Sequence, residues 1–400
     1  DLAIDPFAPE SDDAVLTEGL QLLGRSNDTD IVAGVFRLNG WSWHNQGLTA
    51  VQELAYLLTS ATQIFRSGTE AGLSAMQIAQ KTSMSIALPA DMFDGIAKCR
   101  ALRRCWIGLM NALSLDATIC PLQLQALPSM RMFNLIDADT NILRTTTALL
   151  GGAIGGADMM TSFAHDALTG GSEMGRRLAR MQQVIMVEES GLGRCLDAAG
   201  GAAFIEARTE ALAKAAWAAF QGLEAAGGAV AANADQTFAV MAQAAALRRE
   251  QKLVTGAQPV LGVTLQPNSQ PVEDLIQRWQ NISRPAAVVE TIRRQMAKAP
   301  PRILILQQGD AFEPRLDAIR QVLSIGGMSA VHLTLPLDQE DAVKTTSPKI
   351  VILLNSKKES LESSVRRQLD NSVLVGGIFE ADDILHSTAQ LQWLIDLAQM

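Results

Sequence analysis

The sequence of residues 141–158, NILRTTTALLGGAIGGAD, decides the fold. Its apolar spacing predicts a helix over Asp139–Leu150, and the residues that follow predict a strand over Ala157–Phe163. The same order continues on both sides, with a strand over Ala117–Leu127 before this segment and a helix over Glu173–Glu189 after it. This alternation of strands and helices predicts an α/β protein with a parallel sheet or barrel.

The alternation extends through the first 230 residues. Ile31–Leu38 is a short apolar run that suits a barrel strand. Thr49–Arg66 and Ala90–Leu113 have the apolar spacing of helices, and the alanine-rich stretch Glu206–Ala231 predicts one long helix. Thr255–Pro285, which is rich in proline, glycine, asparagine and serine, predicts a linker.

The last hundred residues show a second strand pattern. Apolar runs begin at Ile303, Ala330, Ile350 and Val373, and helical stretches separate them. This arrangement is typical of a small, doubly wound, flavodoxin-like domain. A chain of 400 residues with 48% hydrophobic content and 30 glycines is long enough for two to three such domains.

Charge and cysteine content narrow the function classes. The net charge is −9 and no block of basic residues is present, which argues against nucleic acid or an anionic membrane surface as partner. The cysteines at 99, 105, 120 and 195 lack the Cys-x-x-Cys spacing of zinc sites. The apolar stretch from Ala148 to Phe163 is broken by Asp158 and is too short to span a bilayer. With no signal-peptide pattern, we expect a cytoplasmic protein with reduced, mostly buried thiols.

The motifs around residues 141–158 resemble those of one known family. Five further stretches follow in that family's order and spacing: Arg180–Gln183, Glu188–Arg194, Asp197–Glu206, Ala215–Trp217 and Glu224–Gly228. Together they resemble the second half of the barrel in adenosylcobalamin-dependent acyl-CoA mutases, the methylmalonyl-CoA mutase family. The resemblance runs from about Asp5 onward and becomes weak after residue 300.

The resemblance implies that the substrate side of the barrel has lost its chemistry. Where the family has a Tyr-His pair, the chain reads Trp41-Ser42, and a hydroxyl without a base cannot replace an imidazole. His44 lies two residues on and would face the same side as Ser42 on a strand. It is a weak candidate for a substitute, the alternative being an ordinary barrel-rim histidine. Leu127 stands where the family has a glutamine, which removes an amide that could hold a thioester carbonyl.

The cobalamin motif is also degenerate by this comparison. The family's Asp-x-His-x-x-Gly supplies a histidine ligand to cobalt, a carboxylate that orients it and a glycine that allows close approach. Ala311, Glu313 and Leu316 stand at these three positions. Because a carboxylate is a poor substitute for imidazole on cobalt, we expect this chain to bind neither metal nor cofactor.

A basic cluster precedes these motifs, formed by Lys98, Arg100, Arg103 and Arg104 on the helix over Ala90–Leu113. A solvated helix face is the simpler interpretation of the cluster. Contact with a partner or with a CoA phosphate is the alternative.

The full pattern is similar to the small, non-catalytic subunit of heterodimeric methylmalonyl-CoA mutases. It implies a catalytic large subunit as the partner, which would carry adenosylcobalamin and interconvert methylmalonyl-CoA and succinyl-CoA. One alternative is a divergent acyl-CoA mutase that is active by itself. A free-standing CoA- or nucleotide-binding module is the other, although Gln308-Gly309-Asp310 lacks a glycine-rich phosphate loop.

The predicted domains leave a structural problem. We expect residues 1–230 to form the C-terminal half of a TIM-type β/α barrel, residues 231–300 a helical and extended linker, and residues 301–400 a degenerate flavodoxin-like domain of the cobalamin-binding type. A closed barrel takes about 250 residues, and few strands precede the linker here. Relative to the family the front half is missing, so two sheet edges would be open. We expect the other half in a further segment or a separate chain.

Overall fold

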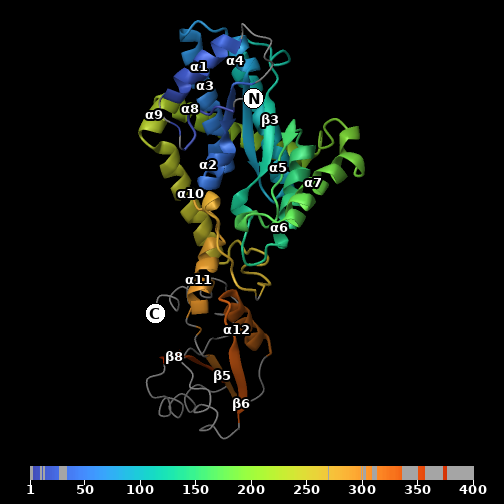
Figure 1. The fold of residues 1–400 in the computed structure, drawn as a ribbon, viewed down its shortest axis with the longest axis vertical. Helices are drawn as coiled ribbons and strands as arrows, with labels where there is room; N and C mark the ends of the chain where they lie inside the picture. The colour runs from blue at the N-terminus through green and yellow to red at the C-terminus, as the bar shows by residue number, and fades with distance from the viewer. Residues whose placement is uncertain are drawn as a thin grey trace. The chain divides into compact units, whose positions relative to one another are not determined.

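The computed structural model describes residues 3–9, 11, 14–26, 34–268, 270–298, 300, 303–308, 313–335, 350–355 and 373–375 (Figure 1). These form two compact units that interleave along the chain. Unit 1 comprises Asp1–Phe133, Ala138–Arg248 and Leu275–Arg284, and unit 2 comprises Asn134–Asp137, Arg249–Asp274 and Pro285–Met400. The domain limits at residues 230 and 300 stay predictions.

Unit 1 is built on a four-stranded parallel sheet in the order β1-β2-β3-β4. The strands are β1 (Phe36–Asn39), β2 (Thr82–Leu88), β3 (Gln123–Pro128) and β4 (Met159–Met160). The prediction of an α/β protein with a parallel sheet is therefore confirmed. The predicted strands over residues 117–127 and 157–163 are shorter in the structure, because turns and loops take up the remaining residues.

Strand β2 was missed by the sequence patterns, although it lies at the centre of the sheet. Met84, Ile86 and Leu88 are fully buried, but serines alternate with them. The Ser83 hydroxyl donates to the Phe36 carbonyl at 3.1 Å, and that of Ser85 donates to Asn39 Oδ1 at 3.0 Å. A central strand buried on both faces can carry hydroxyls when neighbouring strands bind them, and such a strand does not resemble an apolar run.

Helices follow the strands of unit 1 at the predicted places. The helices predicted over residues 49–66 and 90–113 are confirmed as α3 and α5, and a capping box between Thr49 and Gln52 begins α3. The predicted long helix over residues 206–231 is two helices, because Gly227 and Gly228 have φ of +107° and +72°.

Within the described part of the chain no helix is long and apolar enough to cross a membrane. The helices are α1 (Ala14–Ser26), α2 (Gly40–Gln46), α3 (Ala50–Glu70), α4 (Ala75–Gln80), α5 (Met92–Ala112), α6 (Thr140–Ile154), α7 (Glu173–Glu188), α8 (Ala203–Ala225), α9 (Gly228–Ala234) and α10 (Thr237–Val254), with 3₁₀ turns η1 (Met130–Met132), η2 (Ala167–Thr169), η3 (Leu192–Arg194) and η4 (Gln277–Trp279).

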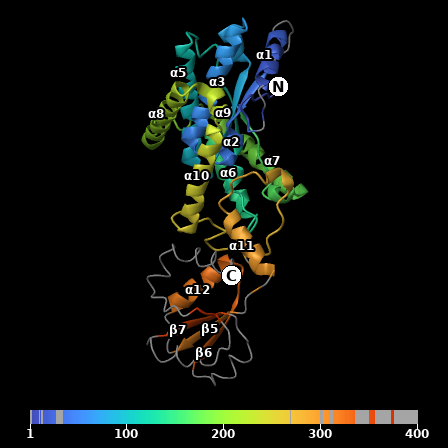
Figure 2. The ribbon, with the colours of Figure 1, turned by 90° about the vertical axis from the view of Figure 1, so that its left-hand side faces the viewer.

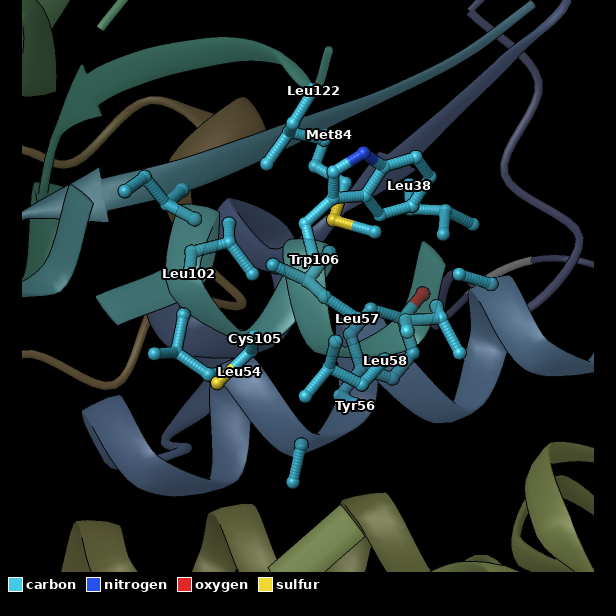
Figure 3. Packing of buried hydrophobic residues seen from close by; sticks show 14 of the residues in the cluster. Leu38, Leu54, Tyr56, Leu57, Leu58, Met84, Leu102, Cys105, Trp106 and Leu122 are labelled. Atoms are coloured by element: carbon cyan, nitrogen blue, oxygen red, sulfur yellow. The ribbon is translucent and has the colours of Figure 1, made fainter. Parts of the chain in front are cut away.

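The main core lies between one face of this sheet and the helices α3 and α5. Trp106 of α5 is central to it, with Leu38 and Met84 of the sheet on one side and Leu57 and Leu58 of α3 on the other (Figure 3). All five side chains are at most 1% exposed, and the Trp106 indole donates to the Cys120 carbonyl at 2.9 Å. Helix α8 packs against α3 and α5, so unit 1 has a sheet, an inner helix layer and an outer helix layer (Figure 2).

One edge of the sheet is covered by the first described residues. Ile4 forms a parallel bridge with Phe36, and its carbonyl accepts the Arg37 amide at 2.9 Å. The buried Asp5 carboxylate accepts the Asn39 amide at 2.6 Å and the Tyr56 hydroxyl at 2.8 Å. The expectation of two open edges is therefore wrong at β1. At β4 no strand among the described residues pairs on the outer side.

Unit 2 contains a second four-stranded parallel sheet in the order β6-β5-β7-β8. Its strands are β5 (Ile303–Gln308), β6 (Ala330–Leu335), β7 (Ile350–Asn355) and β8 (Val373–Val375), which confirms all four predicted apolar runs as strands. Helices α11 (Ala287–Lys298) and α12 (Glu313–Ile325) belong to this unit. Arg293 of α11 donates to the carbonyls of Ser324 at 2.7 Å and Ile325 at 2.9 Å, so it caps α12.

The glycines of residues 141–158 let α6 approach α5 closely. A Cβ on Gly151 would lie 2.9 Å from the Met92 carbonyl oxygen, and one on Gly155 would lie 2.9 Å from the Cys99 Cβ. Neither position has room for a side chain without a shift of α5. The glycine pattern that decides the fold therefore acts through packing.

We predict that Gly151→Val destabilises unit 1 by about 1–3 kcal/mol, because the added methyl groups meet the backbone of α5. The measurement is urea unfolding followed by tryptophan fluorescence. Thr147→Val is the matched control, since residue 147 is exposed on the same helix and both side chains are β-branched. Equal transition midpoints for the two variants would contradict the packing argument.

Candidate functional site

Ser42 and His44 lie on α2, the short helix that directly follows β1 at the carboxyl end of the sheet. Asn39 caps this helix, since its side chain accepts the Ser42 amide at 3.2 Å. On a helix, residues two apart are separated by about 200° around the axis. The expectation that His44 faces the same side as Ser42 is therefore wrong. Ser42 is half-buried, whereas His44 is 3% exposed.

Both ring nitrogens of His44 are engaged inside the protein. Nδ1 lies 2.7 Å from Glu53 Oε2 on α3, and Nε2 lies 2.9 Å from Ser129 Oγ, which directly follows β3. The Glu53 carboxylate accepts the Nδ1 hydrogen bond, and the direction of the bond between Nε2 and the Ser129 hydroxyl depends on the tautomer. In this conformation His44 has no nitrogen available for a substrate.

Glu53 is the centre of this buried network. Its Oε1 accepts the Ala87 amide at the end of β2 at 2.9 Å, and its Oε2 also accepts a hydrogen bond from the Lys98 ammonium. Lys98 donates in addition to the Ala87 carbonyl at 2.7 Å. Burial raises the pKa of Glu53 and lowers that of Lys98, and the attraction between the two charges opposes both shifts. Nothing in the sequence indicated this role for Glu53, because a glutamate in the first turn of a helix is ordinarily a solvent-exposed residue.

The basic cluster on α5 is not one solvated face. Lys98 is 1% exposed, so that interpretation is wrong for it. Arg100 pairs with Asp197 and with Glu206, the latter at 2.6 Å. In the same way Arg103 pairs with Asp158 at 2.8 Å and Arg104 with Glu210 at 2.6 Å. The pairs of Arg100 and Arg104 hold α8 and the loop before it against α5, whereas the pair of Arg103 holds the residue that directly precedes β4. These pairs leave the CoA-phosphate alternative without support.

Three aromatic rings pack together at the carboxyl end of the sheet. Trp41 follows β1, Phe163 follows β4, and their ring centroids are 5.6 Å apart in a stacked arrangement. Trp279 of η4 meets both rings edge-on, at 6.5 Å and 5.9 Å. The Trp41 indole also donates to the Pro128 carbonyl at the end of β3, at 2.9 Å. Parallel α/β folds bind ligands at this end of the sheet.

Residues 275–284, which we name the strap, bring Trp279 to this position. The Ile276 amide donates to the Leu168 carbonyl at 3.0 Å, and the Trp279 indole donates to the Ala167 carbonyl at 2.8 Å. At the other end the Ser283 amide donates to the Asn45 carbonyl on α2 at 2.8 Å. The sequence predicted a linker here, and the signal against it was a tryptophan within a proline-rich stretch.

Two of the remaining candidate positions, Leu127 and Leu316, carry apolar side chains that the structure describes. Leu127 is half-buried on β3, on the sheet face that carries Gln123 and Gln125. Leu316 is 7% exposed and packs on α12 with Ile303 and Ile305 of β5. Ala311 and the side chain of Glu313 lie outside the described residues. Among the residues that are described, no cluster of three or more His, Cys, Asp or Glu could hold a metal ion.

Comparison with known proteins identifies the family. The family model for methylmalonyl-CoA mutase matches residues 35–331. The probable methylmalonyl-CoA mutase small subunit of Mycobacterium tuberculosis strain H37Rv is 34% identical over 309 residues, which cover 74% of this chain and 50% of the relative. The chain belongs to the methylmalonyl-CoA mutase family. Enzymes of this family are generally cobalamin-dependent.

Other members of the mutase family are similar to the chain as well. The methylmalonyl-CoA mutase small subunit of Streptomyces virginiae is 31% identical over 322 residues, 76% of this chain and 52% of that subunit. The large subunit from the same organism is 29% identical over 259 residues, 64% of this chain and 35% of that subunit. The chain thus spans about half the length of the small subunits that it matches.

We predict that Lys98→Met costs about 3–5 kcal/mol of unfolding free energy, because it leaves the Glu53 carboxylate buried without its cation. Arg104→Met on the same helix is the control. Its side chain is 57% exposed, and loss of a surface pair of this kind costs less than about 1 kcal/mol. Adding Glu53→Gln to Lys98→Met removes the charge and should recover part of the loss in urea unfolding.

The Lys98→Met defect should also depend on pH. Burial raises the pKa of Glu53 above 4.5 in the folded state and Lys98 opposes this rise, so removal of Lys98 raises that pKa further. The folded variant therefore holds the proton more tightly than its unfolded chain does, and by more than in wild type. Stability is then lost as pH rises from about 4.5 through the folded-state pKa. The difference from wild type should be smaller near pH 4 than near pH 7. A difference that is independent of pH would contradict the assignment of an ionised Glu53.

Proposed function

We propose that this chain is the non-catalytic small subunit of an adenosylcobalamin-dependent methylmalonyl-CoA mutase. A catalytic large subunit forms the heterodimer with it, binds the cofactor and interconverts methylmalonyl-CoA and succinyl-CoA. The role of the small chain is to stabilise the large one. One observation carries the proposal: at the carboxyl end of the sheet Trp279 packs against Trp41 and Phe163, and both ring nitrogens of His44 are engaged within the protein.

Residue chemistry around this end supports a non-catalytic role. His44 lies about 200° around the helix from Ser42, and its two ring nitrogens are bonded to Glu53 and Ser129. Leu127 cannot donate a hydrogen bond to a thioester carbonyl. Near-neutral proton transfer needs a group with a suitable pKa within reach of the substrate, and these positions supply none.

The positions of the cobalamin motif do not fit the cofactor. Leu316 fills part of the hydrophobic core of unit 2, where a glycine would leave space for a ligand to approach. Ala311 and Glu313 provide no imidazole. We therefore assign adenosylcobalamin to the partner subunit.

We also propose the finer architecture. The parallel sheet of unit 1, with helices after its strands, is half of an eight-stranded β/α barrel. In unit 2 the strand order β6-β5-β7-β8 places the second strand beside the first and the third on its other side. That order agrees with a flavodoxin-like sheet.

We predict that titration of the purified chain with adenosylcobalamin leaves the corrin absorption spectrum unchanged. A cobalamin-binding catalytic mutase subunit serves as the positive control under the same conditions. Substitution of Leu316 by glycine alone should not create binding, because the imidazole is still lacking. Micromolar binding that is lost when a histidine of this chain is substituted would refute the assignment of the cofactor to the partner.

We predict that the chain co-purifies with a methylmalonyl-CoA mutase large subunit when both are co-expressed, and that the complex melts at a higher temperature than the chain alone. Binding only to the folded state raises its stability by mass action. The measurements are gel filtration and thermal unfolding of the single chain and the mixture. Two separate peaks with unchanged melting temperatures would count against a subunit role.

A further inference from the structure

A pocket of about 290 Å³ opens between helices α5 and α8, which lie side by side in unit 1 (Figure 2). All of the residues that line it belong to these two helices, and none of them lies at the carboxyl end of the sheet. The pocket is therefore separate from the candidate site around His44. Its volume is near the lower end of the range for small-molecule sites, which begins at about 300 Å³.

The floor of the pocket is apolar and uncharged. Cys105 of α5 and Ala213 of α8 both line it, and they are 3% and 7% exposed. The Cys105 thiol donates a hydrogen bond to the Ala213 carbonyl, with 3.6 Å between the sulfur and the oxygen. Burial raises the pKa of Cys105 to about 11, so the thiol is neutral at physiological pH and is a poor nucleophile. The floor therefore suits noncovalent contact with an apolar group.

An aromatic ring forms one wall of the pocket. Trp217 of α8 is half-buried, and its ring reaches the backbone of α5 at Gly108, where a Cβ would lie 3.3 Å from two of the ring carbons. Phe220 packs against the same ring in a T-shaped arrangement, with 5.2 Å between the ring centroids. The orientation of Trp217 is thus set by the protein itself. A wall of this kind favours a ligand with a planar ring, which can stack on the indole or meet it edge-on.

The rim of the pocket carries more positive than negative charge. The Glu210 carboxylate pairs with Arg104 at 2.6 Å and with Lys214 at 3.1 Å, so two cations share one anion. The hydrogen bond from Lys214 lowers the pKa of Glu210, which is therefore ionised at neutral pH. Arg104 is 57% and Lys214 75% exposed, and together they have more N–H donors than one carboxylate can accept. In a chain with a net charge of −9, this rim attracts an anion.

We propose that the pocket binds a small aromatic carboxylate. The ring of the ligand packs against Trp217 over the apolar floor, and its carboxylate accepts hydrogen bonds from Arg104 and Lys214 at the rim. An inorganic anion would leave the aromatic wall and the floor without a contact, and a neutral apolar molecule would leave the excess charge without a partner. A whole nucleotide or acyl-CoA is too large for 290 Å³. The site is independent of the proposed role as a mutase subunit.

The test is ligand-observed NMR on the full chain, with 1-naphthoate as the probe and the neutral 1-naphthamide as its matched comparison. We expect naphthoate to bind with a dissociation constant of about 1 mM or less, and the amide to bind at least about tenfold more weakly. Lys214→Glu should weaken naphthoate binding at least about tenfold, because it reverses a charge at the rim. Arg248→Glu is the control for net charge, since Arg248 is exposed on α10 and does not line the pocket.

A second pair of variants tests the place of binding. Ala218 lines the pocket and is exposed, so Ala218→Leu should fill part of the space and abolish binding. Ala211→Leu is the matched control, because Ala211 is exposed on the same helix but does not line the pocket. Both variants should melt with the parent chain, since neither position is buried.

Each outcome decides for or against the site. Binding of naphthoate that both Lys214→Glu and Ala218→Leu remove, while their controls keep it, supports the proposal. No binding at millimolar naphthoate overturns it, as does binding that Ala218→Leu leaves intact. Equal affinities for the acid and the amide overturn the assignment of a carboxylate. If naphthoate does not bind and a mutase large subunit instead protects Trp217 from solvent quenching, the pocket belongs to a protein contact and the small-molecule site is refuted.

Discussion

The buried carboxylate of Glu53 is the interaction on which the arrangement of unit 1 depends. It joins the end of β2 through Ala87, helix α5 through Lys98 and helix α2 through His44. Ser129 continues the network to the end of β3. A buried charge is tolerated only when it is paired and hydrogen-bonded, so these elements cannot move apart without exposing or orphaning it. The carboxyl end of the sheet is thereby held in one conformation.

That conformation has a chemical consequence. A histidine is useful in catalysis when one nitrogen is free to exchange a proton with the substrate. Here both nitrogens of the ring are bonded to other side chains of the protein, and the aromatic cluster of Trp41, Phe163 and Trp279 lies at the same end of the sheet. The contacts that stabilise this end of the sheet are therefore the same ones that engage both nitrogens of His44.

The residues that reveal the family act through packing and internal hydrogen bonds in this chain. Because Gly151 and Gly155 have no side chain, α6 packs closely against α5. Gln182 of α7 donates a hydrogen bond to α6. Glu224, in the last matching stretch, accepts a hydrogen bond from Arg66 at 2.9 Å and one from Thr59 on α3. Recognition of a family by such residues establishes its fold, whereas the chemistry has to be judged at the site itself.

The sequence by itself determined the elements whose signal is local. Helices α3 and α5 follow from apolar periodicity and capping residues, and β5–β8 from short apolar runs between helices. Only the tertiary structure decided the burial of Lys98, the conformation of His44 and the place of Trp279. Their environment is made by residues far away in the chain, such as Glu53 for Lys98 and Phe163 for Trp279. For the same reason β2 escaped prediction: its serines are compatible with a central strand only because β1 binds their hydroxyls.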